Sequence, residues 1–418
     1  MEAVALSAPA FDYAAFFRQQ LLEEVAYWQQ QTTEPADPER LRQKRSQLLT
    51  TLRFALESEA AWPAAQALIV AFSPYMERWG DWGPWVVTVQ NALARATSLG
   101  DTPAQARLSS SLARLFHLQS RHQAAIAQYR RTLILARLAG DVYNEARACT
   151  NLGYLYTERG QWLRAEVLCY HALQRFTELG SDYGRAHTEN HFGILYTRKA
   201  KWDLARLHLE KACGIWQASD DSFGLMRGNI NLGLLYIDME QPDQALTCLT
   251  YALSLAETMN NEVERASILI NLGLVYRLQG EAIEAQRYAS QAKAIYERYS
   301  MLTGLGRAYH NLGMAYVDQQ QWVEAKDHLE TAHKIWQQLD NKWGEMTAII
   351  GLIEFELAQG HQTDATARLQ ELERYQARYG SRYNRPYLQS LLQRYGRNLP
   401  SEVKRQAAAK TLPKPKFF

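Results

Sequence analysis

The sequence HTENH places His187 and His191 four residues apart, which sets both imidazoles on one face of a helix. Two histidines at this spacing can bind zinc when other side chains complete the coordination sphere. Glu189 lies two residues from each histidine and points to another face of such a helix. Because no third ligand is evident and arginines stand at the corresponding places Arg147 and Arg227, we expect no structural or catalytic metal here.

Sequence motifs of the common enzyme classes are absent. The chain contains no GxxxxGK[ST], no GxSxG and no HExxH, so a standard NTPase, hydrolase or metalloprotease site is not expected. The carboxylates are scattered and form no obvious acid–base pair. The sequence therefore predicts neither catalytic residues nor a bound cofactor.

Composition and hydropathy argue against nucleic-acid-binding, disulfide-bonded, secreted and membrane proteins. The 418 residues are 47% hydrophobic and 22% charged, with a net charge of +2, which suits a soluble protein with a large core and carries no nucleic-acid signature. The cysteines form no CxxC pair, which favours reduced, buried thiols: Cys149, Cys169, Cys213 and Cys248. The N-terminus does not resemble a signal peptide, and no segment approaches the roughly 20 apolar residues that span a bilayer. We expect a cytoplasmic protein.

A 40-residue period organises the chain. Each unit has a Leu-Gly or Phe-Gly pair, a tyrosine three residues after the glycine and an alanine twelve residues after it. The glycines are Gly153, Gly193, Gly233, Gly273 and Gly313; the tyrosines are Tyr156, Tyr196, Tyr236, Tyr276 and Tyr316; and the alanines are Ala165, Ala205, Ala245, Ala285 and Ala325. A weaker form of the pattern occurs in the unit before these five and in the unit after them. Such a period indicates a repeat architecture.

Each unit has the pattern of two helices. Apolar spacing predicts a first helix near 144–159 and a second near 162–178, separated by a break at Gly160 and Gln161. Asp, Ser or Asn residues at the joins between units can cap the first helix of the next unit, as at Asp141, Ser181 and Asn261. A glycine in mid-helix costs roughly 1 kcal/mol relative to alanine. We interpret the repeated glycine as a site of close approach, with Gly153 facing Ala165 on the second helix.

This pattern resembles the tetratricopeptide repeat, lengthened from the usual 34 residues to 40 and without the closing proline. It is similar to the arrays of kinesin light chain, Pins-type spindle proteins, bacterial Rap regulators and the sensor regions of STAND-type regulators. The resemblance implies an all-α fold, a right-handed α-solenoid of helix-turn-helix repeats with helical caps.

Four segments are predicted along the chain. Residues 1–60 form an N-terminal helical cap. It has an amphipathic helix over 11–30 with one apolar face of Phe17, Leu21, Val25 and Trp28, and a second helix that starts at Asp37-Pro38 and carries Leu41, Leu48, Leu52 and Leu56. Residues 61–100 form a degenerate repeat and 101–380 an array of seven repeats. Residues 381–418 form a C-terminal capping helix and a flexible basic tail.

The first helix of each repeat carries a second stripe, which in the family faces the concave surface. An arginine row consists of Arg107, Arg147, Arg227 and Arg307, with His187 in one gap; an asparagine row consists of Asn151, Asn231, Asn271 and Asn311, with His191 in its gap; and a deeper row consists of Tyr154, Ile194, Leu234, Leu274 and Met314. Arginines near helix N-termini favour a carboxylate, and asparagine suits the backbone of an extended peptide. The alternative is that the asparagines only bond neighbouring helices and that the arginines are solvated.

We therefore predict a non-enzymatic scaffold or adaptor for protein–protein interaction. A peptide or protein segment is expected along 147–317, with an acidic group at the arginine row. The alternative function is a regulatory sensor subunit whose array binds a signal and controls a separate effector. No membrane partner is expected, and only the basic tail could contact nucleic acid.

Overall fold

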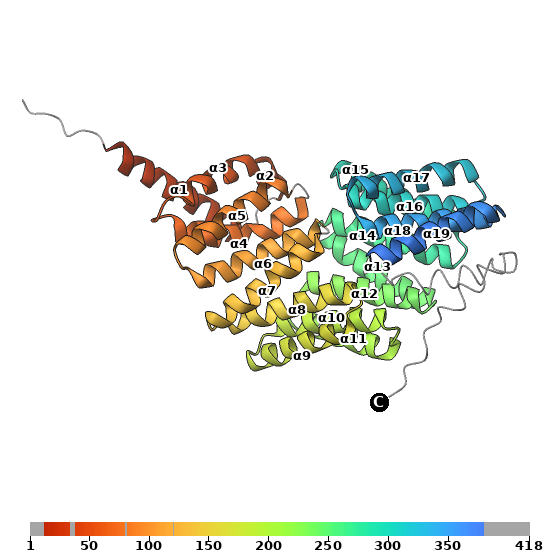
Figure 1. The fold of residues 1–418 in the computed structure, drawn as a ribbon, viewed down its shortest axis with the longest axis horizontal. Helices are drawn as coiled ribbons and strands as arrows, with labels where there is room; N and C mark the ends of the chain where they lie inside the picture. The colour runs from red at the N-terminus through yellow and green to blue at the C-terminus, as the bar shows by residue number, and fades with distance from the viewer. Residues whose placement is uncertain (1–11, 34–37, 80–81, 120, 380–418) are drawn as a thin grey trace, which may run out of the picture. The chain divides into compact units, whose positions relative to one another are not determined.

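Helical hairpins make up the described part of the chain, which comprises residues 12–33, 38–79, 82–119 and 121–379 of a computed structural model. All regular structure in these ranges is helical, so the predicted all-α solenoid of paired helices is confirmed (Figure 1). The chain divides into two units, Met1–Ala148 and Cys149–Phe418. The capping helix and basic tail predicted for 381–418 lie outside the described residues.

The first unit begins with three helices. They are α1 (Tyr13–Thr33), α2 (Pro38–Gln43) and α3 (Arg45–Ala55). Leu21, Val25 and Trp28 of α1 are buried, whereas Phe17 is exposed and lies edge-on to Phe54. The prediction of one helix after Asp37-Pro38 was wrong, because the helix is interrupted at Lys44. No glycine or proline marks this interruption, so the apolar spacing could not reveal it.

Two helical pairs complete the first unit. They are α4 (Trp62–Trp79) with α5 (Gly83–Ser98), and α6 (Thr102–Leu118) with α7 (His122–Leu138). The next helix, α8 (Val142–Glu158), begins in this unit and ends in the second. Its partner is α9 (Trp162–Glu178), so the helix bounds expected near 144–159 and 162–178 agree with the structure within two residues.

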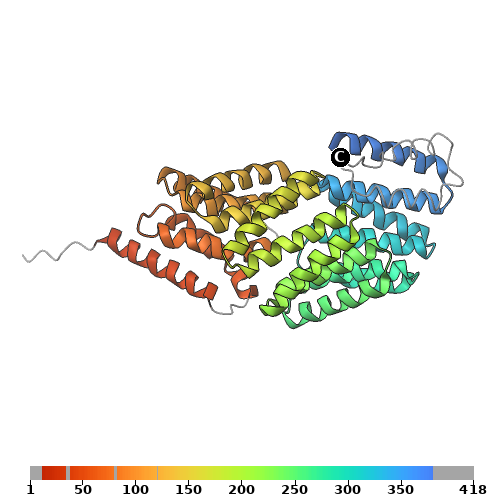
Figure 2. The same cartoon turned by 90° about the horizontal axis from the view of Figure 1, so that it is seen from below.

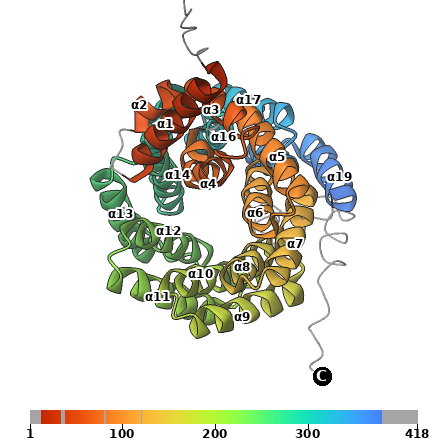
Figure 3. The ribbon, with the colours of Figure 1, turned by 90° about the vertical axis from the view of Figure 1, so that its left-hand side faces the viewer.

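The second unit repeats this hairpin. Its further helices are α10 (Asp182–Arg198), α11 (Trp202–Ala218), α12 (Ser222–Asp238), α13 (Pro242–Thr258), α14 (Glu262–Leu278), α15 (Ala282–Arg298), α16 (Leu302–Asp318), α17 (Trp322–Gln338), α18 (Lys342–Ala358) and α19 (Gln362–Tyr379). We call the even-numbered helices from α8 onward A helices and the odd-numbered ones from α9 onward B helices. The helices of this unit lie side by side in sequence order (Figure 2). In Figure 3, α10 and α12 lie on the inner side of its arc, and α11 and α13 on the outer side.

The predicted caps are present. The side chains of Asp141, Ser181 and Asn261 each accept a hydrogen bond from the backbone N–H three residues later. These bonds satisfy N–H groups that the first turn of a helix leaves unpaired. No helix in the described residues combines the length and apolarity needed to cross a bilayer.

A left-handed residue ends most helices of the array. Glycine takes this conformation at Gly160, with φ of 67°, and at Gly280, with φ of 82°. Other helices end with a residue that has a Cβ atom, such as Ala200 with φ of 52° and Gln320 with φ of 58°. The backbone N–H groups around these residues bond to carbonyls of the preceding turn, as from Lys201 to Tyr196. The left-handed conformation costs a residue with a Cβ roughly 1–2 kcal/mol.

We therefore expect Ala200→Gly and Gln320→Gly each to stabilise the protein by about 1 kcal/mol, since glycine removes the clash of Cβ with the backbone. Urea denaturation followed by circular dichroism measures the change. Gly280→Ala is the matched control and should destabilise by a similar amount. A loss of stability in both glycine variants would contradict this account of the turns.

The repeated mid-helix glycine lies against the B helix of its own hairpin. A Cβ atom on Gly153 would lie 2.6 Å from Sγ of Cys169 and 3.3 Å from the carbonyl oxygen of Ala165. A Cβ on Gly193 would lie 2.5 Å from Cδ2 of Leu209. The close approach predicted from the sequence is thus present, although Ala165 contributes its backbone and the side chain at the interface comes from the next turn.

A second set of glycines fits beneath aromatic rings, which sequence reasoning missed. The ring on a B helix covers the glycine at the start of the next A helix, as Trp216 covers Gly224. The same arrangement joins Phe176 with Gly184, Tyr296 with Gly304 and Trp336 with Gly344. Where the B-helix residue is alanine, the A-helix residue is larger: Ala136 with Asn144, and Ala256 with Glu264. Alignment of the repeats could have revealed these pairs, because a large residue at one of the two positions always occurs with a small residue at the other.

Candidate binding surface on the A helices

The inner face of the second unit consists of the sides of the A helices that point away from the B helices. Adjacent A helices contact each other directly, so equivalent positions line up from repeat to repeat. Tyr154, Ile194, Leu234 and Leu274 of the predicted apolar row are half-buried and therefore retain exposed surface. Met314 differs. It is buried against Val317, Leu329 and Leu352 in the core, so it is not available to a partner.

The asparagine row separates into two classes. Asn151 is half-buried, and its side chain has no hydrogen-bond partner among the described residues. Asn231 is also half-buried. Its Nδ2 donates to Oδ1 of Asn190 at 2.8 Å, and its own oxygen accepts nothing in the described part of the chain. Asn271 and Asn311 are only 2% and 8% exposed, so they serve the packing of the helices. Asn151 and Asn231 are therefore the amides of this row that keep unused hydrogen-bonding groups.

The arginines also differ in their surroundings. Arg147 is exposed and Arg227 is half-buried. Arg307 donates to Oγ of Ser267 and to Oδ1 of Asn271, both at 3.3 Å, so it joins α16 to α14. Arg107 lies in the first unit, where it donates to Gln66. Of the second unit's arginines in this row, Arg227 is the one that faces a half-buried asparagine one turn away.

The two histidines take part in separate contacts. The ring of His187 lies 4.4 Å from that of Tyr183 and edge-on to Trp216 at 5.4 Å. His191 packs against Tyr154 at 5.1 Å, and its Nδ1 lies 3.2 Å from the carbonyl oxygen of Thr150. Within the described ranges, neither histidine belongs to a group of three potential metal ligands.

The acidic residue between the histidines points away from them. Glu189 lies 2.5 Å from Nδ1 of His208 on α11, and the ring of His208 stacks on those of Phe192 and Tyr196. This placement agrees with the helical geometry predicted for HTENH. The histidine pair is therefore an aromatic part of the inner face.

The C-terminal ends of the A helices carry charges that the sequence analysis did not single out. Burial lowers the pKa of Arg198, while Asp238 and Glu158 oppose the change. Burial likewise raises the pKa of Asp238, and Arg198 opposes it. Both residues are nevertheless exposed to solvent, so the burial that shifts these pKa values is only partial.

An ion-pair network crosses the C-terminal part of the inner face. Arg277 of α14 donates to Asp318 of α16 at 2.5 Å and to Glu354 of α18 at 2.9 Å. The side chain of Glu354 is only 3% exposed. Glu354 stands forty residues after Met314, in the register of the apolar row. The accessible part of the apolar row therefore extends from α8 to α14.

Comparison with known proteins identifies the repeats. A family model described as tetratricopeptide repeat matches residues 144–218 and 225–298, and a second model with the same description matches 305–339. No curated protein matches the sequence.

Solved structures share the fold. A Rap protein complexed with Competence and Sporulation Factor has a TM-score of 0.65 at 11% identity, covering 87% of this chain and 99% of that one. The apo form of the quorum sensor NprR from B. thuringiensis has a TM-score of 0.53 at 14% identity, covering 86% and 99%. A STAND protein with a tetratricopeptide repeat sensor from Pyrococcus horikoshii has a TM-score of 0.54 at 13% identity, covering 82% and 53%. At these identities the likeness concerns the fold.

Proposed function

Since the chain is a tetratricopeptide-repeat protein, we propose that it is a non-enzymatic scaffold whose inner face binds a peptide or protein segment. The observation that carries the proposal is the row of half-buried apolar side chains from Tyr154 to Leu274, which lies between polar rows. A face that served packing alone would have little reason to keep apolar side chains accessible in four successive repeats.

The proposed segment lies along α8 to α14. Asn151 and Asn231 have unused hydrogen-bonding groups and would bond to its backbone. The apolar row would contact its side chains. Arg227, close to the N-terminus of α12, would pair with an acidic group, because the arginine and the helix dipole favour negative charge there. Beyond α14 the network of Arg277 covers the inner face, so the proposed site ends before it.

A regulatory sensor remains the second candidate. The Rap structure contains the Competence and Sporulation Factor, and NprR is described as a quorum sensor. A chain of this fold can therefore take a signal molecule. In that case this protein would bind a signal at the same face and act on a separate effector.

The proposal predicts that peptides selected from a random displayed library will bind the inner face and will be enriched in acidic residues. Arg227→Glu should weaken their binding at least tenfold, because it replaces attraction by repulsion at a partly buried site. Asn231→Ala should weaken it by a smaller factor through loss of one hydrogen bond. Fluorescence anisotropy with a selected peptide measures both effects.

Arg287→Glu, on the B helix α15, is the matched control and should bind the peptide like the unaltered protein. Circular dichroism verifies that the variants are folded. Selected peptides that bind the Arg227 and Asn231 variants with unchanged affinity would place the binding surface elsewhere.

A further inference from the structure

A histidine and two carboxylates come together where α18 is followed by α19. Glu356 lies in the last turn of α18, His361 in the connecting turn and Asp364 in the first turn of α19. Their possible ligand atoms, one from each side chain, all lie within 4.8 Å of one another. Among the described residues of the second unit, no other three histidine, cysteine or carboxylate side chains converge in this way. Sequence reasoning did not single out this group.

The turn between the two helices fixes the first two of these residues. Gly360 is left-handed, with φ of 80°, and the backbone N–H of His361 donates to the carbonyl oxygen of Glu356 at 2.9 Å. This brings Nδ1 of His361 to 3.2 Å from Oε2 of Glu356. Metal–ligand bonds of the length found for zinc place two ligands of a tetrahedral ion about 3.3 Å apart. The observed separation therefore suits two ligands of one ion.

The other carboxylate oxygen of Glu356 faces a cation. Nε of Arg368 on α19 lies 3.9 Å from Oε1 of Glu356. The Glu356 side chain is only 10% exposed, so its orientation is set by the protein rather than by water. Contacts of this kind orient a ligating carboxylate from outside the coordination sphere. The two carboxylates outnumber this guanidinium, so the group as a whole still attracts a cation.

Comparison with the preceding repeats shows that the fold does not require these side chains. Glu356 stands in the position of the repeated tyrosine, and no preceding repeat of the second unit has a histidine in the position of His361. The positions equivalent to His361 hold Gln161, Lys201, Gln241, Glu281 and Gln321, and those equivalent to Asp364 hold Arg164, Leu204, Gln244, Glu284 and Glu324.

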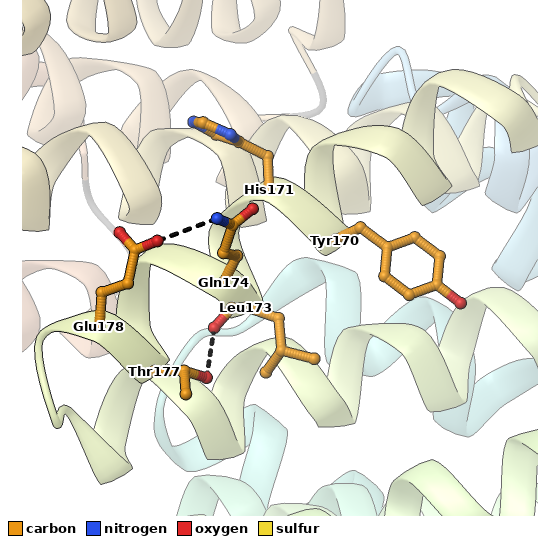
Figure 4. A pocket seen from close by; sticks show the side chains of 6 residues that line it. All are labelled: Tyr170, His171, Leu173, Gln174, Thr177 and Glu178. Carbon is orange, nitrogen blue, oxygen red and sulfur yellow. Dashed lines mark hydrogen bonds between the residues drawn. The ribbon is translucent and has the colours of Figure 1, made fainter.

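A histidine and a glutamate on the outer helix α9 provide a contrast. His171 and Glu178 help to line a shallow hollow on this helix (Figure 4). Glu178 accepts hydrogen bonds from Gln174 and Arg175, both at 2.9 Å. Within the described part of the chain, neither His171 nor Glu178 belongs to a group of three potential ligands. The pair on α9 is therefore a matched control for the group between α18 and α19.

We propose that Glu356, His361 and Asp364 bind one divalent transition-metal ion of the zinc class. One imidazole nitrogen and two carboxylate oxygens form a ligand set that suits zinc, whereas Mg²⁺ and Ca²⁺ prefer oxygen ligands alone. His361 and Asp364 are exposed, so water completes the coordination. The ion joins the end of α18 to the start of α19 and so stabilises the folded hairpin.

Isothermal titration of the full chain with Zn²⁺ alone, after treatment with EDTA and dialysis, tests the proposal. His361→Ala and Asp364→Asn should each bind one equivalent of zinc less than the unaltered protein. His171→Ala and Glu178→Gln are the matched controls and should bind as much zinc as the unaltered protein. Because the comparison is between stoichiometries, zinc bound elsewhere on the chain cancels. An excess of Mg²⁺ should not displace the ion, and circular dichroism verifies that every variant is folded.

A gain of affinity provides an independent test. Asp364→His supplies a second imidazole and should lower the dissociation constant for zinc, which a variant that only damaged the fold would not do. With Co²⁺ in place of Zn²⁺, the visible absorption bands should differ between this variant and the unaltered protein, since one oxygen ligand becomes nitrogen. Unchanged zinc stoichiometry in His361→Ala, or no gain of affinity in Asp364→His, would overturn the proposal and leave the group as ion pairs alone.

Discussion

Gly224→Ala will destabilise the protein by about 1–3 kcal/mol, although alanine is the better helix former. The added Cβ would lie 2.6 Å from Cε2 of Trp216, whose ring is fully buried and cannot move aside without disturbing the core. Trp216→Ala alone will cost about 3–5 kcal/mol, because it leaves a large cavity. Urea denaturation measures both changes.

The double variant Trp216→Ala/Gly224→Ala will be more stable than the sum of the single effects predicts, by on the order of 1 kcal/mol. With alanine at position 216 the Cβ added at position 224 no longer meets the indole ring, just as Ala256 leaves room for Glu264 in the next repeat. Gly214→Ala is the matched control in α11. No atom lies within 4 Å of its added Cβ, so this change will stabilise the helix by up to about 1 kcal/mol. Strict additivity of the Trp216 and Gly224 effects would refute the size complementarity proposed for these pairs.

The second large effect concerns the ion-pair network between α14 and α18. Arg277→Leu will destabilise the protein by about 3–5 kcal/mol, because the buried Glu354 loses the guanidinium that it contacts. The loss belongs mainly to the desolvated carboxylate rather than to the ion pair itself. Replacement of both residues, as Arg277→Leu/Glu354→Met, should therefore recover most of the stability, since methionine already occupies this register position at Met314.

Arg287→Leu is the control for this experiment. Arg287 pairs with Glu284 on the exposed surface of α15, where both side chains are well solvated, so the change will cost less than about 1 kcal/mol. Thermal and urea denaturation of the three variants decide the matter. If the double variant is less stable than Arg277→Leu alone, the buried charge is not the source of the loss.

The Trp216–Gly224 contact and the Arg277 ion-pair network both help to fix how successive repeats pack. In an array most contacts of a repeat are with its neighbours, so local contacts largely determine how successive helices stack. Trp216 joins α11 to α12, and Arg277 reaches from α14 to α18 across an intervening repeat. The second contact ties three successive A helices, α14, α16 and α18, to one another.

Local signals in the sequence are sufficient to predict the hairpin and its repetition. Apolar spacing and the glycine at the hairpin turn predicted α8 and α9 within two residues, because these signals act within one or two helical turns. The mid-helix glycine of each repeat was interpreted correctly as a close contact, since its cost in a helix demands a packing reason. Caps such as Ser181 were predicted for the same local reason.

Which side chains of the inner face are accessible depends on the packing between repeats. In the sequence, Asn231 and Asn271 occupy the same position of the repeat, and so do Leu274 and Met314, so the pattern predicts the same exposure for both members of each pair. Yet Asn271 and Met314 are buried while Asn231 and Leu274 are not. The difference arises from contacts between neighbouring repeats, as when Arg307 reaches Asn271. Such contacts join residues about forty or eighty positions apart, and a periodic pattern records the type of residue at each position but not how closely the adjacent helices pack around it.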